Sequence, residues 1–193
     1  MERSRARRIG RLLVGVLLVG VLCAGAGYGY WVFVNHRFAP VTEGQFYRSG
    51  AMPPETLQDI VRQYGIRTVI DFRESEYEDK IAAEHSALSR IGVQHFSLPS
   101  KQVPSDETVE AFLKIMEDPK NRPVLVHCKH GVGRAVLFSA IYRIEYEGWP
   151  NERARRASRL ILYKSSFDSN RSKGIFLRNY TPRLRRAGQI KLF

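Results

Sequence analysis

The feature that most constrains this chain is an uninterrupted run without charged side chains, from Leu12 to Val34. A helix of that length, rising ~1.5 Å per residue, spans about 34 Å, which is enough to cross a hydrocarbon core of about 30 Å. The run therefore predicts a transmembrane anchor at 12–34. It divides the rest of the chain into a basic N-terminus at 1–11, a linker at 35–44 and one domain at 45–193.

The charges on either side of the apolar run predict its orientation. Five arginines precede it and one closely follows it: Arg3, Arg5, Arg7, Arg8 and Arg11, then Arg37. Positive flanks stay on the cytoplasmic side, so the N-terminus is expected in the cytoplasm and the domain outside it, in the periplasm if the source is bacterial. A cleavable signal peptide is the alternative, because Ala24-Gly25-Ala26 offers small residues for a peptidase. The apolar run continues to Val34, which is long for a signal peptide and favours an uncleaved anchor.

Beyond the apolar run, strands and helices are predicted to alternate. Extended segments are expected at 46–48, 66–72, 93–98 and 122–128, and helices at 53–65, 75–92, 106–118, 133–148 and 150–164. Such alternation is typical of an α/β domain, with a central mostly parallel sheet flanked by helices.

Cys128 is the one cysteine outside the apolar run, so the domain can form no internal disulfide and has no second thiol to resolve a sulfenate. It stands where a predicted strand ends, and Gly131 and Gly133 follow it in a loop that leads to Arg134 on the next helix. Ligands bind at such strand ends, and loop amides at a helix N-terminus bind oxyanions. The same surroundings stabilise a thiolate. With an arginine that forms two parallel hydrogen bonds to phosphate oxygens, the arrangement favours thiolate attack on phosphorus.

The segment "HCKHGVGR", 127–134, resembles the HCx5R signature loop of the cysteine-dependent tyrosine and dual-specificity phosphatases. The segment from "FYRSG" to "VIDFRES" is similar to the bacterial and fungal tyrosine-phosphatase-like members, so the resemblance covers about 45–165. It implies Cys128 as the nucleophile, Arg134 as the residue that binds phosphate and the transition state, and His127 as a residue that holds the loop and favours the thiolate. It implies an amide cradle formed by Lys129, His130, Gly131, Val132 and Gly133. Neither a metal nor a cofactor is implied.

The resemblance also places a general acid on the loop after the strand at 93–98, where Asp106 is the candidate. The alternative is that Asp106 only begins a helix, because Ser105, Asp106 and Glu107 are typical of a helix start. Asp71 and Arg73 are expected to form a structural pair at a strand end.

Ala135 departs from the family pattern, which usually has a serine or threonine directly after the arginine. The hydroxyl there stabilises the cysteine as it leaves the phosphoenzyme, so its absence predicts slow hydrolysis of the intermediate. A membrane-tethered phosphate-binding pseudophosphatase is therefore the alternative to an active enzyme, and a sulfurtransferase is a third, less favoured one.

The formal net charge of +12 favours polyanionic partners. With Lys129 and His130 in the loop, we expect a phosphorylated protein or a phosphoinositide as substrate and a membrane as partner, rather than nucleic acid.

Overall fold

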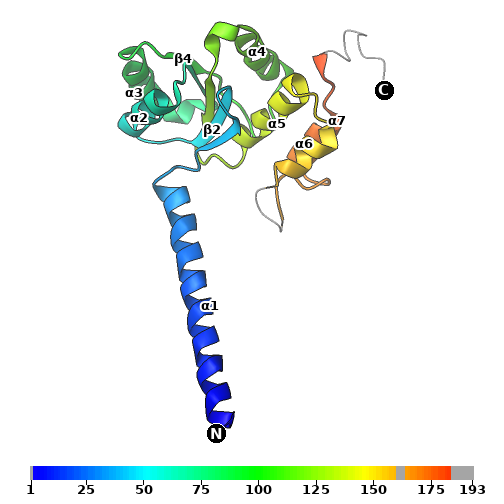
Figure 1. The fold of residues 1–193 in the computed structure, drawn as a ribbon. Helices are drawn as coiled ribbons and strands as arrows, with labels where there is room; N and C mark the ends of the chain where they lie inside the picture. The colour runs from blue at the N-terminus through cyan, green and yellow to red at the C-terminus, as the bar shows by residue number, and fades with distance from the viewer. Residues whose placement is uncertain (1, 160–163, 184–193) are drawn as a thin grey trace. The chain divides into compact units, whose positions relative to one another are not determined.

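The computed structural model describes residues 2–159 and 164–183 of the chain, which divides into two compact units, Met1–Arg37 and Phe38–Phe193 (Figure 1). The first unit consists mainly of one long helix, α1 (Glu2–Phe33). Its Gly10–Phe33 stretch is, among the described residues, the one helix long and apolar enough to cross a membrane. A signal sequence passes the same test, so this helix agrees with both of the alternatives weighed above.

The second unit is built on a five-stranded sheet with the strand order β1-β2-β5-β3-β4. The strands are β1 (Ala39–Thr42), β2 (Phe46–Gly50), β3 (Thr68–Asp71), β4 (Gln94–Ser97) and β5 (Val124–Cys128). The helices are α2 (Pro54–Tyr64), α3 (Glu78–Ser89), α4 (Asp106–Glu117), α5 (Arg134–Tyr146), α6 (Asn151–Ala157) and α7 (Ser172–Asn179), with short 3-10 turns at Ser75–Tyr77 and Pro119–Asn121. The four strands β2, β5, β3 and β4 are parallel, and β1 is antiparallel to β2. This arrangement confirms the predicted α/β fold.

Two hydrophobic cores lie on opposite faces of the sheet because successive strand side chains alternate between the faces. On one face, Leu125 of β5 packs with the apolar residues of α2 and α3. On the other face, Val124 and Val126 pack with α4, α5 and the helices that follow. Burial on both faces explains why β5 reads as a continuous apolar run and lies in the middle of the sheet.

Three elements differ from the sequence prediction. A short edge strand, β1, lies within the segment expected to be a linker. It contains Pro40, which an edge strand tolerates because its outer side pairs with no other strand and so needs no backbone N–H donor. The helix expected at 150–164 ends at Ala157, and residues 160–163 lie outside the described part. Helix α7 was not predicted, because its eight residues include Gly174, a poor helix former, and show little amphipathic pattern. Most of the basic tail, 184–193, is also outside the described residues.

Candidate active site

The candidate site is formed where the central strand β5 ends. Cys128 is its last residue, pairs in register with Gly50 at the end of β2, and accepts a hydrogen bond at its carbonyl oxygen from the amide of Ala51 at 2.8 Å. Its side chain is 3% exposed. Helix α5 begins at Arg134, so the glycine loop (residues 129–133) joins the strand end directly to a helix N-terminus, as the sequence predicted.

Glycine is required at position 131 on two grounds. Its φ of +69° lies in the left-handed region, and a Cβ there would stand 2.5 Å from the amide nitrogen of Gly50. The loop therefore packs backbone to backbone against the end of β2. Arg48 of β2 fixes this contact, because its Nη1 donates to the carbonyl oxygen of Gly131 at 3.2 Å.

Arg134 is buried and held by backbone carbonyls. Its Nη1 donates to the carbonyl oxygens of Phe72 at 2.8 Å and Ser100 at 3.0 Å, which follow β3 and β4, and lies 3.5 Å from a carboxylate oxygen of Glu74. All the Arg134 side-chain contacts found in the described part of the chain use Nη1. The donors on Nε and Nη2 therefore remain for an anion, in the fork geometry that suits phosphate.

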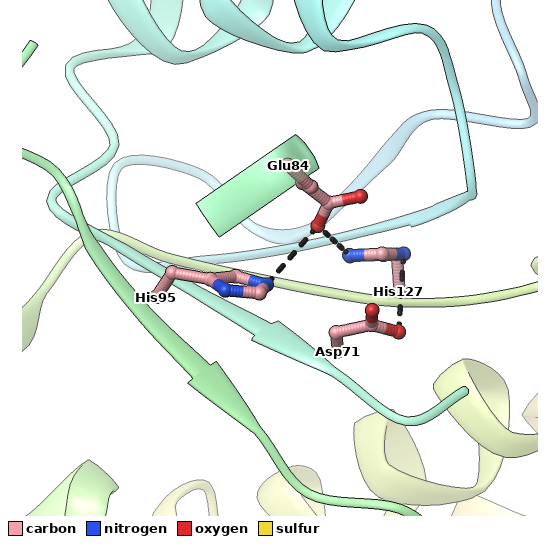
Figure 2. A group of neighbouring side chains, drawn as sticks. All are labelled: Asp71, Glu84, His95 and His127. Carbon is pink, nitrogen blue, oxygen red and sulfur yellow. Dashed lines mark hydrogen bonds and ion pairs between the residues drawn. The ribbon is translucent and has the colours of Figure 1, made fainter. Parts of the chain in front are cut away.

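His127 points away from the glycine loop, because its side chain and that of Cys128 alternate along β5. Figure 2 shows its ring among Asp71, Glu84 and His95. Its Nε2 lies 2.6 Å from Oε1 of Glu84, and its Nδ1 lies 3.8 Å from Oδ1 of Asp71. Sequence reasoning did not identify this buried cluster.

The cluster around His127 balances its own charges. Arg73 donates to Oδ2 of Asp71 at 2.8 Å and to Oε2 of Glu84 at 2.6 Å, which confirms the predicted structural pair of Asp71 and Arg73. Burial by itself lowers the pKa of His127, but the charges of Glu84 and Asp71 outweigh it and raise that pKa. Burial likewise tends to raise the pKa of Glu84. The charge of His127 and the hydrogen bonds that Glu84 accepts outweigh burial and hold the pKa of Glu84 far below its usual range. The Arg73 guanidinium and the His127 ring thus face two carboxylates. These are metal-ligand residue types, but Arg73 contacts Oδ2 of Asp71 and Oε2 of Glu84, and His127 faces their other oxygens.

The other side chains of the glycine loop face outward. Lys129 and His130 are exposed, as is Val132. Lys129 donates from Nζ to the hydroxyl of Tyr77 at 2.6 Å and lies 5.1 Å from the centre of its ring, and this hydrogen bond raises the pKa of Lys129. Positive charge is therefore available at the mouth of the site, beside an aromatic ring that the sequence did not single out.

Asp106 is the first residue of α4, and the hydroxyl of Ser105 caps this helix by accepting from the amide of Thr108 at 3.4 Å. Its side chain is exposed and lines a surface pocket with Val103 and with Phe176 of α7. The helix-start alternative for Asp106 thus describes its local structure, whereas its role as an acid stays a prediction.

One side chain from a distant part of the chain also lies at the glycine loop. Lys173 of α7 donates from Nζ to Oε1 of Gln102 at 2.6 Å, and both groups lie beside Gly133. Sequence reasoning missed this pair because no motif or spacing connects α7 with the loop.

Comparison with known proteins agrees with this geometry. A family model described as "DSP-PTPase phosphatase fused to NAD+ Kinase" matches residues 34–173. The dual specificity protein phosphatase TpbA of Pseudomonas aeruginosa is 30% identical over 110 residues, which is 56% of this chain and 47% of that protein. The inositol diphosphatase DSP3 of Arabidopsis thaliana is 30% identical over 101 residues, covering 50% and 48%. The chain thus spans about half the length of these curated relatives.

A solved structure supports the fold. The core catalytic domain of the PP-IP phosphatase SIW14 from S. cerevisiae superposes with a TM-score of 0.60 at 18% identity, covering 80% of this chain and 94% of that one. Since the family model matches most of the chain, this chain belongs to the dual-specificity and tyrosine phosphatase family.

Proposed function

We propose that this chain hydrolyses phosphate monoesters through a cysteinyl-phosphate intermediate, with Cys128 as the nucleophile. The observation that carries the proposal is the placement of Cys128 and Arg134 at the two ends of one short loop. The cysteine ends the central strand, and the arginine begins the following helix with Nη1 held by two carbonyls. This arrangement suits a tetrahedral oxyanion set against the sulfur.

In the proposed reaction the Cys128 thiolate attacks phosphorus, and the loop amides of 129–133 with Arg134 bind the equatorial oxygens. Asp106 protonates the leaving oxygen as the phosphorus–oxygen bond breaks. A water molecule then attacks the cysteinyl phosphate, its proton passes to the Asp106 carboxylate, and the electron pair of the sulfur–phosphorus bond returns to sulfur.

His127 acts in this scheme as a positioning residue. Its imidazole is anchored by Glu84, and its backbone carbonyl accepts from the amide of Phe72 at 2.9 Å. Both contacts fix the end of β5 from which Cys128 enters the loop. A protonated His127 also places positive charge behind the strand end, which favours the thiolate.

Ala135 supports one alternative, a phosphate-binding pseudophosphatase with impaired turnover. The residue is fully buried on the first turn of α5 and offers no hydroxyl to the departing sulfur. Binding and attack do not use the missing hydroxyl, whereas release of phosphate is the step that Ala135 slows. We favour slow turnover over complete inactivity, because the remaining parts of the site are present.

For the substrate we propose a phosphorylated protein or a phosphoinositide. Dual-specificity protein phosphatase and inositol diphosphatase activities appear in the names of two relatives. The exposed Lys129 supplies positive charge at the mouth of the site for either kind of substrate.

We also propose that residues 12–34 anchor the domain to a membrane, with 1–11 in the cytoplasm and the domain at 45–193 outside it. The apolar stretch Gly10–Phe33 and the arginines before it support this topology. The test labels a single introduced cysteine with an impermeant maleimide in a Cys23→Ser, Cys128→Ser background. A cysteine within 35–44 should react on intact cells and one within 1–11 should not, and the reverse pattern would overturn the topology.

The test of the activity is hydrolysis of an aryl phosphate by the full chain in detergent. We expect vanadate-sensitive release of phosphate that Cys128→Ser abolishes. Cys23→Ser, in the exposed apolar helix, is the matched control and should retain full activity. Equal rates for wild type and Cys128→Ser would overturn the proposal.

A further inference from the structure

Lys173, the second residue of α7, carries a buried ammonium group. Its side chain is 5% exposed, although lysine is rarely buried without a charged partner. Its one hydrogen bond within residues 2–159 and 164–183 goes to the neutral amide oxygen of Gln102, and no carboxylate of these residues pairs with it. Its Nζ also lies 5.6 Å from the centre of the Phe167 ring, which offers a cation–π contact but no negative charge. Because burial of a charge without a counter-ion is costly, the position favours an anion that binds beside it.

The ammonium lies directly on the glycine loop. A Cβ built on Gly133 would stand 3.0 Å from Nζ of Lys173 and 3.2 Å from Oε1 of Gln102. Gly133 directly precedes Arg134, so the ammonium stands at the loop position next to the phosphate-binding arginine. Gln102 belongs to the loop that leads to Asp106. Three segments therefore meet here: the glycine loop, the loop before α4, and α7.

The charges around the glycine loop come from several elements. Arg48 reaches the loop from β2, Lys129 lies in the loop, Arg134 begins α5, and Glu74 after β3 contacts Arg134. Burial lowers the pKa of Lys173, and the nearby Arg134 lowers it further, whereas negative charge on Cys128 opposes both. Lys173 thus adds its ammonium to the cations around the glycine loop.

We propose that Lys173 belongs to the anion site, where its ammonium binds the phosphoryl oxygens and stabilises the Cys128 thiolate. The inference rests on the proposed function for its phosphoryl role and deepens it. When water displaces sulfur from phosphorus, the electron pair returns to Cys128, and the ammonium stabilises that charge while it keeps its own proton. Lys173 thereby takes over part of the role of the hydroxyl that Ala135 lacks.

The test measures alkylation of Cys128 by iodoacetamide as a function of pH, in the full chain in detergent with Cys23→Ser as background. Lys173→Met should move the midpoint of the rate profile upward by about one pH unit, a tenfold loss of thiolate at low pH. It should also weaken protection by inorganic phosphate about tenfold. Lys173→Arg should restore both values toward wild type, because it retains the charge.

Lys101→Met, an exposed lysine next to Gln102, is the matched control and should leave both values unchanged. Lys173→Gln, which retains a donor for Gln102 and removes only the charge, replaces Lys173→Met if that variant unfolds. The proposal would be overturned if Lys173→Met and Lys173→Gln kept the wild-type alkylation midpoint and the wild-type protection by phosphate. It would also be overturned if Lys101→Met shifted the midpoint as much as they do. Alkylation requires no turnover, so an inactive chain that shows the shift refutes the proposed hydrolysis and leaves this inference standing.

Discussion

Replacing Glu84 with glutamine should destabilise the domain by about 3 kcal/mol. The Glu84 carboxylate is 2% exposed and accepts hydrogen bonds from Arg73 and His127, both at 2.6 Å. Removal of one partner from a buried ion pair costs about 3–5 kcal/mol, and we expect the lower end because His127 can release its proton once its counter-ion is gone. For a domain of this size that loss lowers Tm by roughly 6–12 °C.

The pH dependence of this loss has a defined sign. Folding lowers the pKa of Glu84. Its contribution to the stability of the domain is therefore present above about pH 4.5 and is lost as the pH falls through its pKa in the folded state. The pKa of His127 is raised, so its contribution is present below pH 6.5 and is lost as pH rises through the folded value. The stability gap, the difference in free energy of unfolding between wild type and Glu84→Gln, should therefore be largest between about pH 4.5 and 6.5 and should become smaller on either side.

Thermal unfolding of the full chain in detergent, followed by circular dichroism at several pH values, measures this gap. Glu78→Gln changes an exposed carboxylate on the same helix and should alter stability by less than about 0.5 kcal/mol. A gap below about 1 kcal/mol, or a gap that stays constant from pH 5 to 9, would refute the assignment of a charged Glu84–His127 pair.

Three further substitutions probe the loop and the acid. Gly131→Ala should lower both activity and stability, because φ is positive and the new Cβ would stand 2.5 Å from the Gly50 amide nitrogen. Its control is Gly148→Ala, where φ is also positive but the space around the residue is open. This control should lower the free energy of unfolding by about 1–2 kcal/mol and leave kcat unchanged. Arg134→Lys should reduce kcat/KM for an aryl phosphate about 10²–10³-fold, since a lysine offers no fork to phosphate, and a loss below threefold would contradict its role. Asp106→Asn should slow the first step, release of the alcohol or phenol before the phosphoenzyme is hydrolysed, about 10²-fold for an alkyl phosphate and little for p-nitrophenyl phosphate, because only the poor leaving group needs a proton. Equal effects on this step for both substrates would exclude Asp106 as the acid.

Sequence reasoning predicted those parts of the molecule that depend on local pattern. The strand end at Cys128, the glycine loop and the helix start at Arg134 follow from β-branched and apolar runs broken by glycine, and the parallel sheet follows from their alternation with helices. The pair of Asp71 and Arg73 was expected as well, because both stand at one strand end.

What sequence reasoning missed depends on contacts between distant segments. Glu84 meets His127 only because α3 packs over the sheet, and Lys173 reaches Gly133 only because α7 returns to the loop. Neither contact leaves a periodic signal in the sequence. Strand β1 and helix α7 are too short for a pattern of their own, and tertiary packing determines them.

Rapid-quench kinetics of the full chain with p-nitrophenyl phosphate, comparing wild type with Ala135→Ser, test most directly whether Cys128 forms a phosphoenzyme. Ala135 is buried, so serine adds one hydroxyl with little change of volume. We expect a burst of nitrophenol stoichiometric with Cys128 followed by slow turnover, and a faster steady state for Ala135→Ser because the hydroxyl helps sulfur to leave. Absence of a burst and of turnover in both proteins would contradict Cys128 as the nucleophile of a phosphatase.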